Sequence, residues 1–316
     1  MAEVVKKATR EGYGEGLVEL GAEYPQLVVL DADLAAATKT GSFKKAYPDR
    51  FFDCGIAEGN MMSIAAGLAT TGKIVFASSF AMFAVGRAFE QVRNSIGYPH
   101  LNVKIGATHA GISVGEDGAT HQCCEDIALM RSIPGMTILN PADAVEAKKA
   151  VRAAVEMDGP VYLRFGRLAV PVITKESEPF VIGKGKQLTK GTDVTIVATG
   201  LMVNEALIAA DILKTKGVSA RVINMACIKP IDKDILVKAA RETGALVTAE
   251  EHNIIGGLGS AVAEVLSEAL PVPVLRVGVE DTFGRSGPAV ELLKLYGLTA
   301  EHIVEKALAA VAMKKN

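Results

Sequence analysis

The chain has 316 residues, a formal net charge of -2 and a hydrophobic content of 49%. These values exclude an intrinsically disordered protein, and the scattered lysines and arginines form no basic stripe for a nucleic-acid partner. The length predicts two domains, while 31 Gly, many Ala and no Trp indicate closely packed elements and an apolar surface for self-association.

The N-terminal ten residues lack the uninterrupted apolar core of a secretory signal peptide. The apolar stretch over 61–83 is interrupted by Lys73 and by small polar residues, so it predicts a helix and a strand and no membrane span. The four cysteines form no paired framework, and two of them are adjacent. We therefore expect a cytoplasmic protein without a membrane partner.

Helical periodicity alternates with short apolar runs through the first half of the chain. The predicted helices are 10–24, 62–69, 83–95, 124–131 and 142–157, and the predicted strands are 27–31, 74–77, 103–107, 137–139 and 161–165. Because alternating strands and helices form crossover units, residues 1–178 are predicted to form a mostly parallel sheet covered by helices on both faces.

A second, smaller domain of the same α/β class is predicted over 192–316. Its predicted strands are 194–198, 220–224, 245–248 and 274–277, and its predicted helices are 204–214, 231–241 and 259–270. Between the two domains the periodicity is lost near two prolines and a polar run, so residues 179–191 are interpreted as a linker.

An acid stands in an apolar setting of small residues at Glu58, within GIAEGNM (55–61). Desolvation there favours the protonated form of a carboxyl group, which suits donation of a hydrogen bond to a ring nitrogen. A simple preference of the acid for a helix N-terminus remains the alternative. Phe80 and Phe83 follow a predicted strand and are either core residues or a stacking surface for a planar heterocycle.

His109 and His121 bracket the loop GEDGATHQ (115–122), which contains Asp117. Two nearby cysteines suggest zinc, but the spacing matches no structural zinc pattern. Hydrogen bonding and proton transfer to the hydroxyl groups of a sugar-like substrate fit these side chains better.

Arginines at the end of the predicted strand 161–165 suit a substrate phosphate. Arg164 and Arg167 are the candidates there, with surface ion pairs as the alternative, and Arg10 is a weaker candidate. The run GGLGS (256–260) could be mistaken for a nucleotide-binding loop, but it lacks the third glycine and the acid of that motif. We interpret it as tight packing of a helix on a strand.

Together these residues closely resemble the C-terminal half of transketolase, and in particular the separate C-terminal subunit of split transketolases. The resemblance covers essentially the whole chain and depends on GIAEGNM (55–61), GEDGATHQ (115–122) and DTFGRSG (281–287). It implies a pyrimidine-binding domain followed by a C-terminal domain, with thiamine diphosphate as the cofactor. The implied reaction transfers a two-carbon ketol unit between sugar phosphates.

The resemblance also implies a role for each matching position. Glu58 is similar to the acid that bonds the pyrimidine nitrogen. The implied cofactor contacts are Phe80 and Phe83, which resemble the ring-stacking pair, and Asp33 and Leu34, which resemble residues near the thiazolium. The implied substrate contacts are His109, Asp117 and His121, which resemble groups that read hydroxyls and assist proton steps, and Arg10 and Arg167, which resemble a phosphate clamp.

Two positions depart from the family. Ala37, beside Thr38, stands where full-length enzymes carry a phosphate-binding serine, and Gly86 replaces a third aromatic residue. No Gly-Asp-Gly motif with a following Asn pair occurs, so the resemblance implies that an N-terminal partner subunit holds Mg²⁺ (or Ca²⁺) and the diphosphate. We expect an α2β2 assembly that is inactive without that partner.

Other functions remain open at this point. Within the same cofactor chemistry, the alternatives are a 1-deoxyxylulose-5-phosphate synthase-like subunit and a two-oxo-acid dehydrogenase β-like subunit. A non-catalytic assembly subunit that kept the fold is the alternative from another class. His109, the Glu116-Asp117 pair and the stretch 283–287 favour transketolase.

Overall fold

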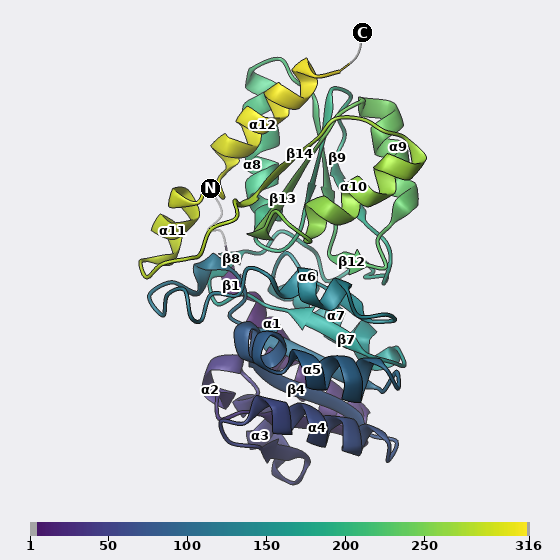
Figure 1. Ribbon diagram of the computed structural model, residues 1–316, viewed down its shortest axis with the longest axis vertical. Coiled ribbons are helices and arrows are strands. Elements are labelled where there is room, and N and C mark those ends of the chain that lie inside the picture. Colours follow the sequence, from purple (N-terminus) through teal and green to yellow (C-terminus); the bar gives the residue numbers. More distant parts are fainter. Residues whose placement is uncertain (1–4, 315–316) are drawn as a thin grey trace.

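The structure is a computed structural model that describes residues 5–314. The first four of the ten N-terminal residues considered for a signal peptide lie outside the described residues. Two sheets, each covered by helices, follow one another along the long axis of the molecule (Figure 1). The predicted α/β class with two mostly parallel, helix-covered sheets is confirmed.

The first sheet has seven strands in the order β12-β6-β7-β5-β4-β2-β3. Only β12 runs antiparallel to its neighbour. The central strands β2, β4, β5 and β7 are buried along their whole length, as expected where helices cover both faces of a parallel sheet. The strands are β2 (Leu27–Asp31), β3 (Phe51–Asp53), β4 (Ile74–Phe80), β5 (Val103–Thr108), β6 (Thr137–Leu139), β7 (Val161–Arg164) and β12 (Cys227–Lys229).

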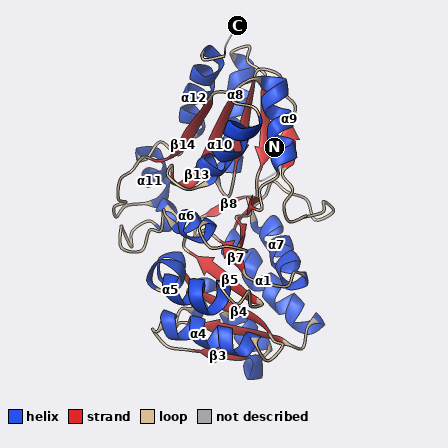
Figure 2. Cartoon of the chain, turned by 45° about the vertical axis from the view of Figure 1, so that its right-hand side comes forward, coloured by secondary structure: helices blue, strands red, loops and turns tan. Residues whose placement is uncertain are grey.

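Helices α1 and α7 pack together on one face of this sheet, and α4 with α5 lies on the other face (Figure 2). The helix predicted over 83–95 is instead two π-helical segments, η2 and η3, separated by the short α5. The helices are α1 (Thr9–Glu23), α2 (Ala35–Thr38), α3 (Gly41–Ala46), α4 (Glu58–Ala69), η2 (Met82–Arg87), α5 (Phe89–Gln91), η3 (Val92–Gly97), α6 (Asp126–Arg131) and α7 (Ala144–Glu156), with 3-10 turns η1 (Pro48–Arg50) and η4 (Ile112–Val114).

The second sheet has five strands in the order β14-β13-β10-β11-β9. Helices α8 and α12 cover one face, and α9 and α10 cover the other (Figure 1). The strands are β9 (Lys186–Thr189), β10 (Val194–Ala198), β11 (Ala220–Asn224), β13 (Leu246–Asn253) and β14 (Val274–Val279). The helices are α8 (Met202–Thr215), α9 (Lys233–Thr243), α10 (Leu258–Ala269), α11 (Ala289–Leu295) and α12 (Ala300–Ala312).

The segment 179–191 is not linker throughout, because β9 forms an antiparallel edge strand within it. Its sequence KQLT is short and only partly buried, so it lacks the apolar pattern that identifies a central strand. A second strand pair, β1 (Lys6–Ala8) with β8 (Ala169–Pro171), was likewise not predicted. This pair fixes the start of α1 beside the segment that follows β7.

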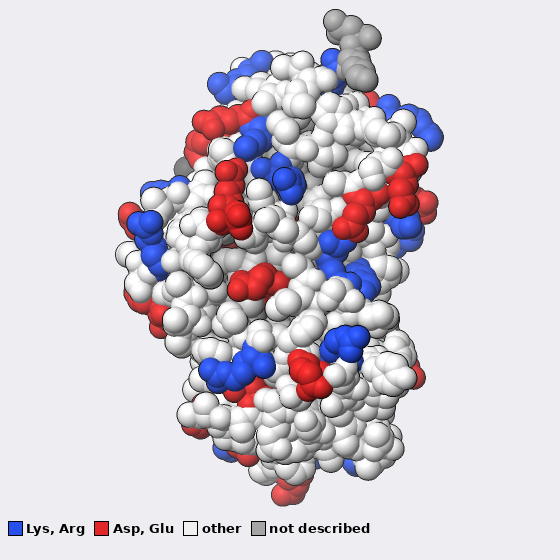
Figure 3. All heavy atoms as spheres, viewed as in Figure 1, with Lys and Arg blue, Asp and Glu red and all other residues white. Residues whose placement is uncertain are grey.

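The two halves share one buried apolar cluster, in which Ile133 and Ile138 of the first half join Leu236 and Leu266 of the second. On the face in Figure 3, charged side chains of both signs are interspersed over the upper and middle parts, while the lower part, over α4, is largely uncharged. Within residues 5–314, no helix is long and apolar enough to cross a membrane.

Candidate functional site

The predicted site residues lie where strands β2, β4, β5 and β7 end. Asp33 and Leu34 follow β2, Phe80 ends β4, His109 follows β5, and Arg167 lies beyond β7. Because these strands are parallel neighbours, their carboxyl ends meet at one edge of the sheet.

Glu58 is the first residue of α4, and only 2% of its side chain is exposed. Its carboxylate accepts a hydrogen bond from Nη1 of Arg87, with Nη1 and Oε2 3.1 Å apart. A carboxylate at this end of a helix also interacts favourably with the helix dipole, so the predicted alternative role applies to the same residue. Arg87 is a partner that the sequence analysis did not identify.

Phe80 and Phe83 face each other with nearly parallel rings, 6.1 Å between centroids and 18° between planes. Phe83 belongs to the π-helix η2, a type of turn that is rare and is frequently found at functional sites. The ring of His109 stacks on Phe80 at 3.8 Å, and the edge of His121 meets Phe83 at 5.1 Å. Four ring side chains therefore form one continuous cluster.

His109 is buried, with a left-handed backbone φ of 56°. Arg10 Nη1 lies 3.2 Å from its Nε2, and Thr108 Oγ1 lies 2.9 Å from its Nδ1. Since a guanidinium can only donate, we assign the proton to Nδ1, which donates to Thr108, and leave Nε2 as the acceptor. Burial, followed by the charges of Arg10 and Arg167, lowers the pKa of His109 to about 3.

Two arginines approach this cluster from different elements. Arg10, in the first turn of α1, donates to the carbonyl of Ala37 at 2.9 Å, and burial together with the charge of Arg167 lowers its pKa. Arg167 donates to the carbonyl of Val114 and lies 3.3 Å from Glu116. The neighbours of the two arginines are joined directly, because Gly166 N–H donates to Thr9 Oγ1 at 2.8 Å.

The loop 115–122 is held against the C-terminal domain. Gln122 Nε2 donates to the carbonyl of Arg285 at 2.9 Å, and a Cβ placed on Gly118 would lie 2.4 Å from Ser286 Oγ. The stretch 281–287, although distant in the sequence, therefore packs directly against the loop. Asp117 is exposed at the turn, and its side chain makes no hydrogen bond within residues 5–314.

Two aspartates accept hydrogen bonds from the loop after β2 and hold it in place. The sequence analysis identified neither of them as a site residue. Asp31 accepts hydrogen bonds from Leu34 N–H at 2.6 Å and from the hydroxyls of Thr38 and Thr40, while burial raises its pKa. Asp53 accepts from the N–H of Asp33, whose φ is +61°. The loop that carries Asp33 and Leu34 is thus ordered, although Asp33 itself is exposed.

Arg164 does not serve either of the roles considered for it. Its guanidinium is buried and pairs with Asp126, with Nε and Oδ2 2.7 Å apart, and it also donates to the carbonyl of Glu251. Through these contacts the side chain lies in the junction between the first half of the chain and β13 of the second half. Alternation along β7 could not separate this position from Arg167, which lies beyond the strand.

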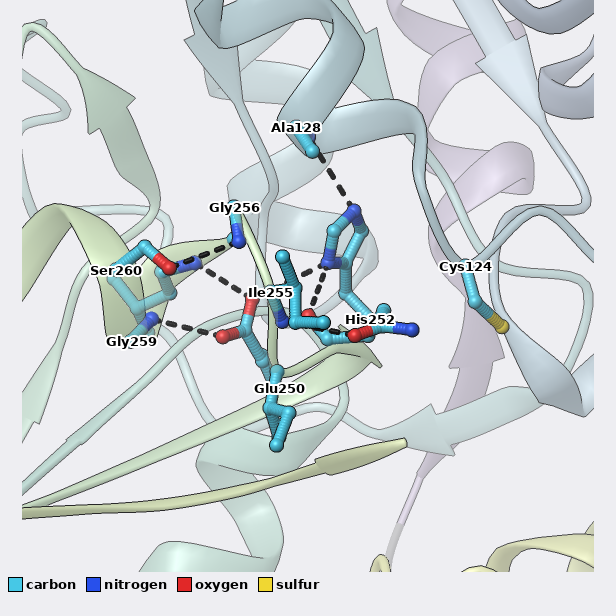
Figure 4. A network of polar contacts seen from close by, with 12 residues as sticks. Cys124, Ala128, Glu250, His252, Ile255, Gly256, Gly259 and Ser260 are labelled. Atoms are coloured by element: carbon cyan, nitrogen blue, oxygen red, sulfur yellow. Dashed lines mark hydrogen bonds and ion pairs between the residues drawn. The ribbon is translucent and has the colours of Figure 1, made fainter. Parts of the chain in front are cut away.

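The run GGLGS (256–260) begins α10 and packs tightly, as predicted. Figure 4 shows the carboxylate of Glu250 at this helix end, where it accepts from the N–H groups of Leu258 and Gly259 at 2.6 and 2.8 Å. A Cβ on Gly257 would lie 2.0 Å from Glu250 Oε2. The chain's own acid, whose pKa burial raises to about 7, thus fills the place where a nucleotide phosphate would bind.

Among residues 5–314, no three His, Cys, Asp or Glu side chains are arranged to hold a metal ion. The four cysteines are free, and Cys123 and Cys124 are buried. Burial raises the pKa of both thiols, which opposes the thiolate form that metal ligation needs.

The chain matches two family models. Residues 5–172 match the transketolase pyrimidine-binding domain, and residues 183–303 match the transketolase C-terminal domain. A Methanocaldococcus jannaschii protein named as a transketolase C-terminal section is 56% identical over 96% of both chains. The 6-deoxy-6-sulfo-D-fructose transketolase subunit SqwH of a Clostridium species is 45% identical over 97% of this chain and 95% of its own length.

The chain also resembles solved structures of transketolases. A split-gene transketolase, described as an inactive β4 tetramer, superposes with a TM-score of 0.90 at 56% identity and covers 98% of this chain and 99% of its own. Transketolase from Leishmania mexicana superposes with a TM-score of 0.83 at 25% identity, and this chain spans 47% of it.

Proposed function

The chain belongs to the transketolase family, and we propose that it is the C-terminal, pyrimidine-binding subunit of a split transketolase. In this proposal it acts with an N-terminal subunit to transfer a two-carbon ketol unit from a ketose phosphate to an aldose phosphate. The family implies thiamine diphosphate as the cofactor. The observation that supports this best is the unbroken series of contacts linking Glu58 to Arg10 through stacked planar side chains.

The residues present fit the pyrimidine half of that cofactor. A buried carboxylate beside two parallel phenyl rings offers one hydrogen-bonding group and one flat apolar wall, which is what an aminopyrimidine ring requires. The same site offers no acidic cluster within residues 5–314 for a diphosphate-bound metal. We therefore assign Mg²⁺ or Ca²⁺ and the diphosphate to the partner subunit.

When bound, thiamine diphosphate supplies an electron sink for cleavage of a carbon–carbon bond. In our proposal Glu58 hydrogen-bonds to the pyrimidine nitrogen and sets the protonation of the ring. Phe80 and Phe83 hold the ring flat and exclude water from it. Asp33 and Leu34 lie on the ordered loop after β2 and would contact the thiazolium part.

The remaining residues are proposed to bind the substrate. His109 is neutral at physiological pH, because its pKa is about 3, so it would act through hydrogen bonds and not as a cation. His121 and Asp117 would contact substrate hydroxyls and help to move protons. Arg10 and Arg167 would bind the phosphate through their planar guanidinium groups.

The departures from the family strengthen the case for these two arginines. Ala37 contributes only its carbonyl, which already accepts from Arg10. The Thr38 hydroxyl is fully buried and bonded to Asp31, so it is not available to bind a phosphate.

The second departure from the family is Gly86. A Cβ there would lie 2.5 Å from Met82 Cε, which indicates that Met82 fills the space beside the missing aromatic residue.

We propose an α2β2 assembly in the cytoplasm, formed through the largely uncharged face over α4 (Figure 3). Exposed apolar side chains on or beside α4 include Ile56 and Ile64, at 77% and 39% exposure. Surfaces of this kind commonly mark protein–protein contacts. The related inactive β4 tetramer is consistent with self-association of this type of chain.

Relatives named as 6-deoxy-6-sulfo-D-fructose and apulose-4-phosphate transketolase subunits indicate that donor sugars vary within the family. A screen of ketose phosphates against pyruvate, performed with the two-subunit enzyme, identifies the donor. Consumption of xylulose 5-phosphate without consumption of pyruvate would support the proposal over a decarboxylating synthase or dehydrogenase.

The substitution Glu58→Gln tests the proposed function. In the two-subunit enzyme it should reduce ketol transfer by at least about 100-fold, because the amide cannot exchange a proton with the pyrimidine. The matched control is Glu268→Gln, on the exposed surface of α10 in the C-terminal domain, which should leave transfer unchanged. Near-normal transfer by the Glu58→Gln enzyme would refute the assignment.

A further inference from the structure

Arg87 contacts both groups that we assign to the cofactor's pyrimidine ring. It lies at the end of the π-helix η2, and 56% of its side chain is exposed. Its Nη1 is 3.1 Å from Glu58 Oε2, and its Cζ lies 4.7 Å from the centroid of the Phe83 ring. The guanidinium therefore uses its edge on the acid and its face on the aromatic ring.

An aminopyrimidine bound by Glu58 and Phe83 would need the same two surfaces in the same way. Both groups are planar, carry hydrogen-bonding nitrogens at the edge and stack by their faces. Arg87 already bonds Oε2 of Glu58 and lies over the Phe83 ring. A pyrimidine that binds the same carboxylate oxygen and the same face of the ring would have to displace the guanidinium.

Within residues 5–314 the bond to Glu58 is the single hydrogen bond of the Arg87 side chain. Because the side chain is more than half exposed, its guanidinium can turn into solvent without losing other partners. Glu58 cannot follow it, since it is buried at the start of α4.

We propose that Arg87 is an internal competitor for the pyrimidine site, and that the cofactor must displace its guanidinium from Glu58 and Phe83 in order to bind. This inference rests on the proposed function, because it takes Glu58 and Phe83 as pyrimidine contacts. Arg87 thereby lowers the affinity for the cofactor.

The test is thiamine binding to the purified full-length chain, measured by isothermal titration calorimetry or saturation-transfer NMR at millimolar thiamine. Arg87→Met should tighten binding about tenfold, because the ion pair and the cation–π contact no longer have to be broken. The matched control is Arg93→Met, an exposed arginine of η3 that bonds Asn94, and it should leave the affinity unchanged. Unchanged thermal unfolding and circular dichroism would show that both variants are folded.

Glu58→Gln, combined with each arginine variant, separates the possible failures. Equal or weaker thiamine binding by Arg87→Met, with binding still lost on Glu58→Gln, overturns the competition and leaves the proposed function intact. Thiamine binding that is absent throughout, or that does not depend on Glu58, overturns both. A tenfold gain that disappears with Glu58→Gln supports both.

Discussion

At the scale of single residues, His109 shows how the site controls protonation. Its ring is stacked on Phe80, bonded to Thr108 and faced by Arg10, so the neutral imidazole is the form that fits. The charges of two nearby arginines would be useful for phosphate binding, and the same charges keep this histidine unprotonated. The histidine therefore serves as an oriented hydrogen-bonding group.

A pH series of unfolding experiments checks this protonation state. Folding lowers the pKa of His109 from 6.5 to about 3, so the unfolded chain takes up the proton first as the pH falls. Its stabilising contribution is complete above pH 6.5 and is lost towards pH 3, with a slope of up to about 1.4 kcal/mol per pH unit. His109→Asn, which tolerates the left-handed backbone, should lose this slope. A wild-type-minus-variant difference that is independent of pH would contradict the assignment.

Several site residues could be predicted from the sequence because each belongs to a contiguous motif. Glu58 lies in GIAEGNM (55–61), and the spacing of Phe80 and Phe83 is local. Arg87 could not be found in the same way, because its contact with Glu58 joins positions in separate elements. Its position four residues after Phe83, on the same turn, was the only local signal.

At the scale of elements, the alternation of helices and strands predicted the parallel sheet and hence the edge at which the site lies. The apolar runs that begin β4 and β13 could be recognised because burial on both faces leaves a strong signal, whereas the more polar ends of these strands, 78–80 and 249–253, were not predicted. The π-helices could not, because their extra residue per turn leaves the apolar pattern close to that of an ordinary helix. Short strands such as β1 and β8 depend on a distant partner and carry no signal of their own.

The pairing of β1 with β8 gives a prediction about the phosphate clamp. Thr9 Oγ1 accepts from Gly166 N–H, and these residues directly precede Arg10 and Arg167. Thr9→Val keeps the shape but leaves that N–H without its partner, at a cost of about 1–3 kcal/mol, and loosens the spacing of the arginines. In the two-subunit enzyme, KM for a phosphorylated donor should rise about fivefold, with kcat nearly unchanged.

Thr9→Ser is the control for this prediction, because it keeps the hydroxyl and should restore the wild-type KM. An unphosphorylated ketose should show the same KM with wild-type enzyme and with Thr9→Val. An equal rise in KM for both kinds of donor would indicate general disorder of the site and would contradict a role in spacing the arginines.

At the scale of the whole molecule, the two domains are more closely joined than the sequence suggested. Strand β12, from the second half, pairs with β6 at the edge of the first sheet, and the apolar cluster is continuous between the halves. The buried Arg164–Asp126 pair, bonded to the Glu251 carbonyl, lies in the same junction. A three-residue strand and a buried ion pair arise only from tertiary contacts, so composition could locate the two sheets but not their connection.

Within residues 5–314, no three His, Cys, Asp or Glu side chains are arranged to hold the metal ion that accompanies the diphosphate of thiamine diphosphate. Our account therefore divides one active site between two polypeptides. In our proposal, this chain supplies the ring-binding acid, the stacking residues and the substrate contacts, and an N-terminal subunit binds the diphosphate and the metal ion.

Ketol transfer by the purified chain, with thiamine diphosphate and Mg²⁺, measured with and without an N-terminal transketolase subunit, tests this division most directly. The account predicts no transfer from the chain alone and transfer from xylulose 5-phosphate to an aldose phosphate once the partner is added. Robust transfer by the single chain would contradict it.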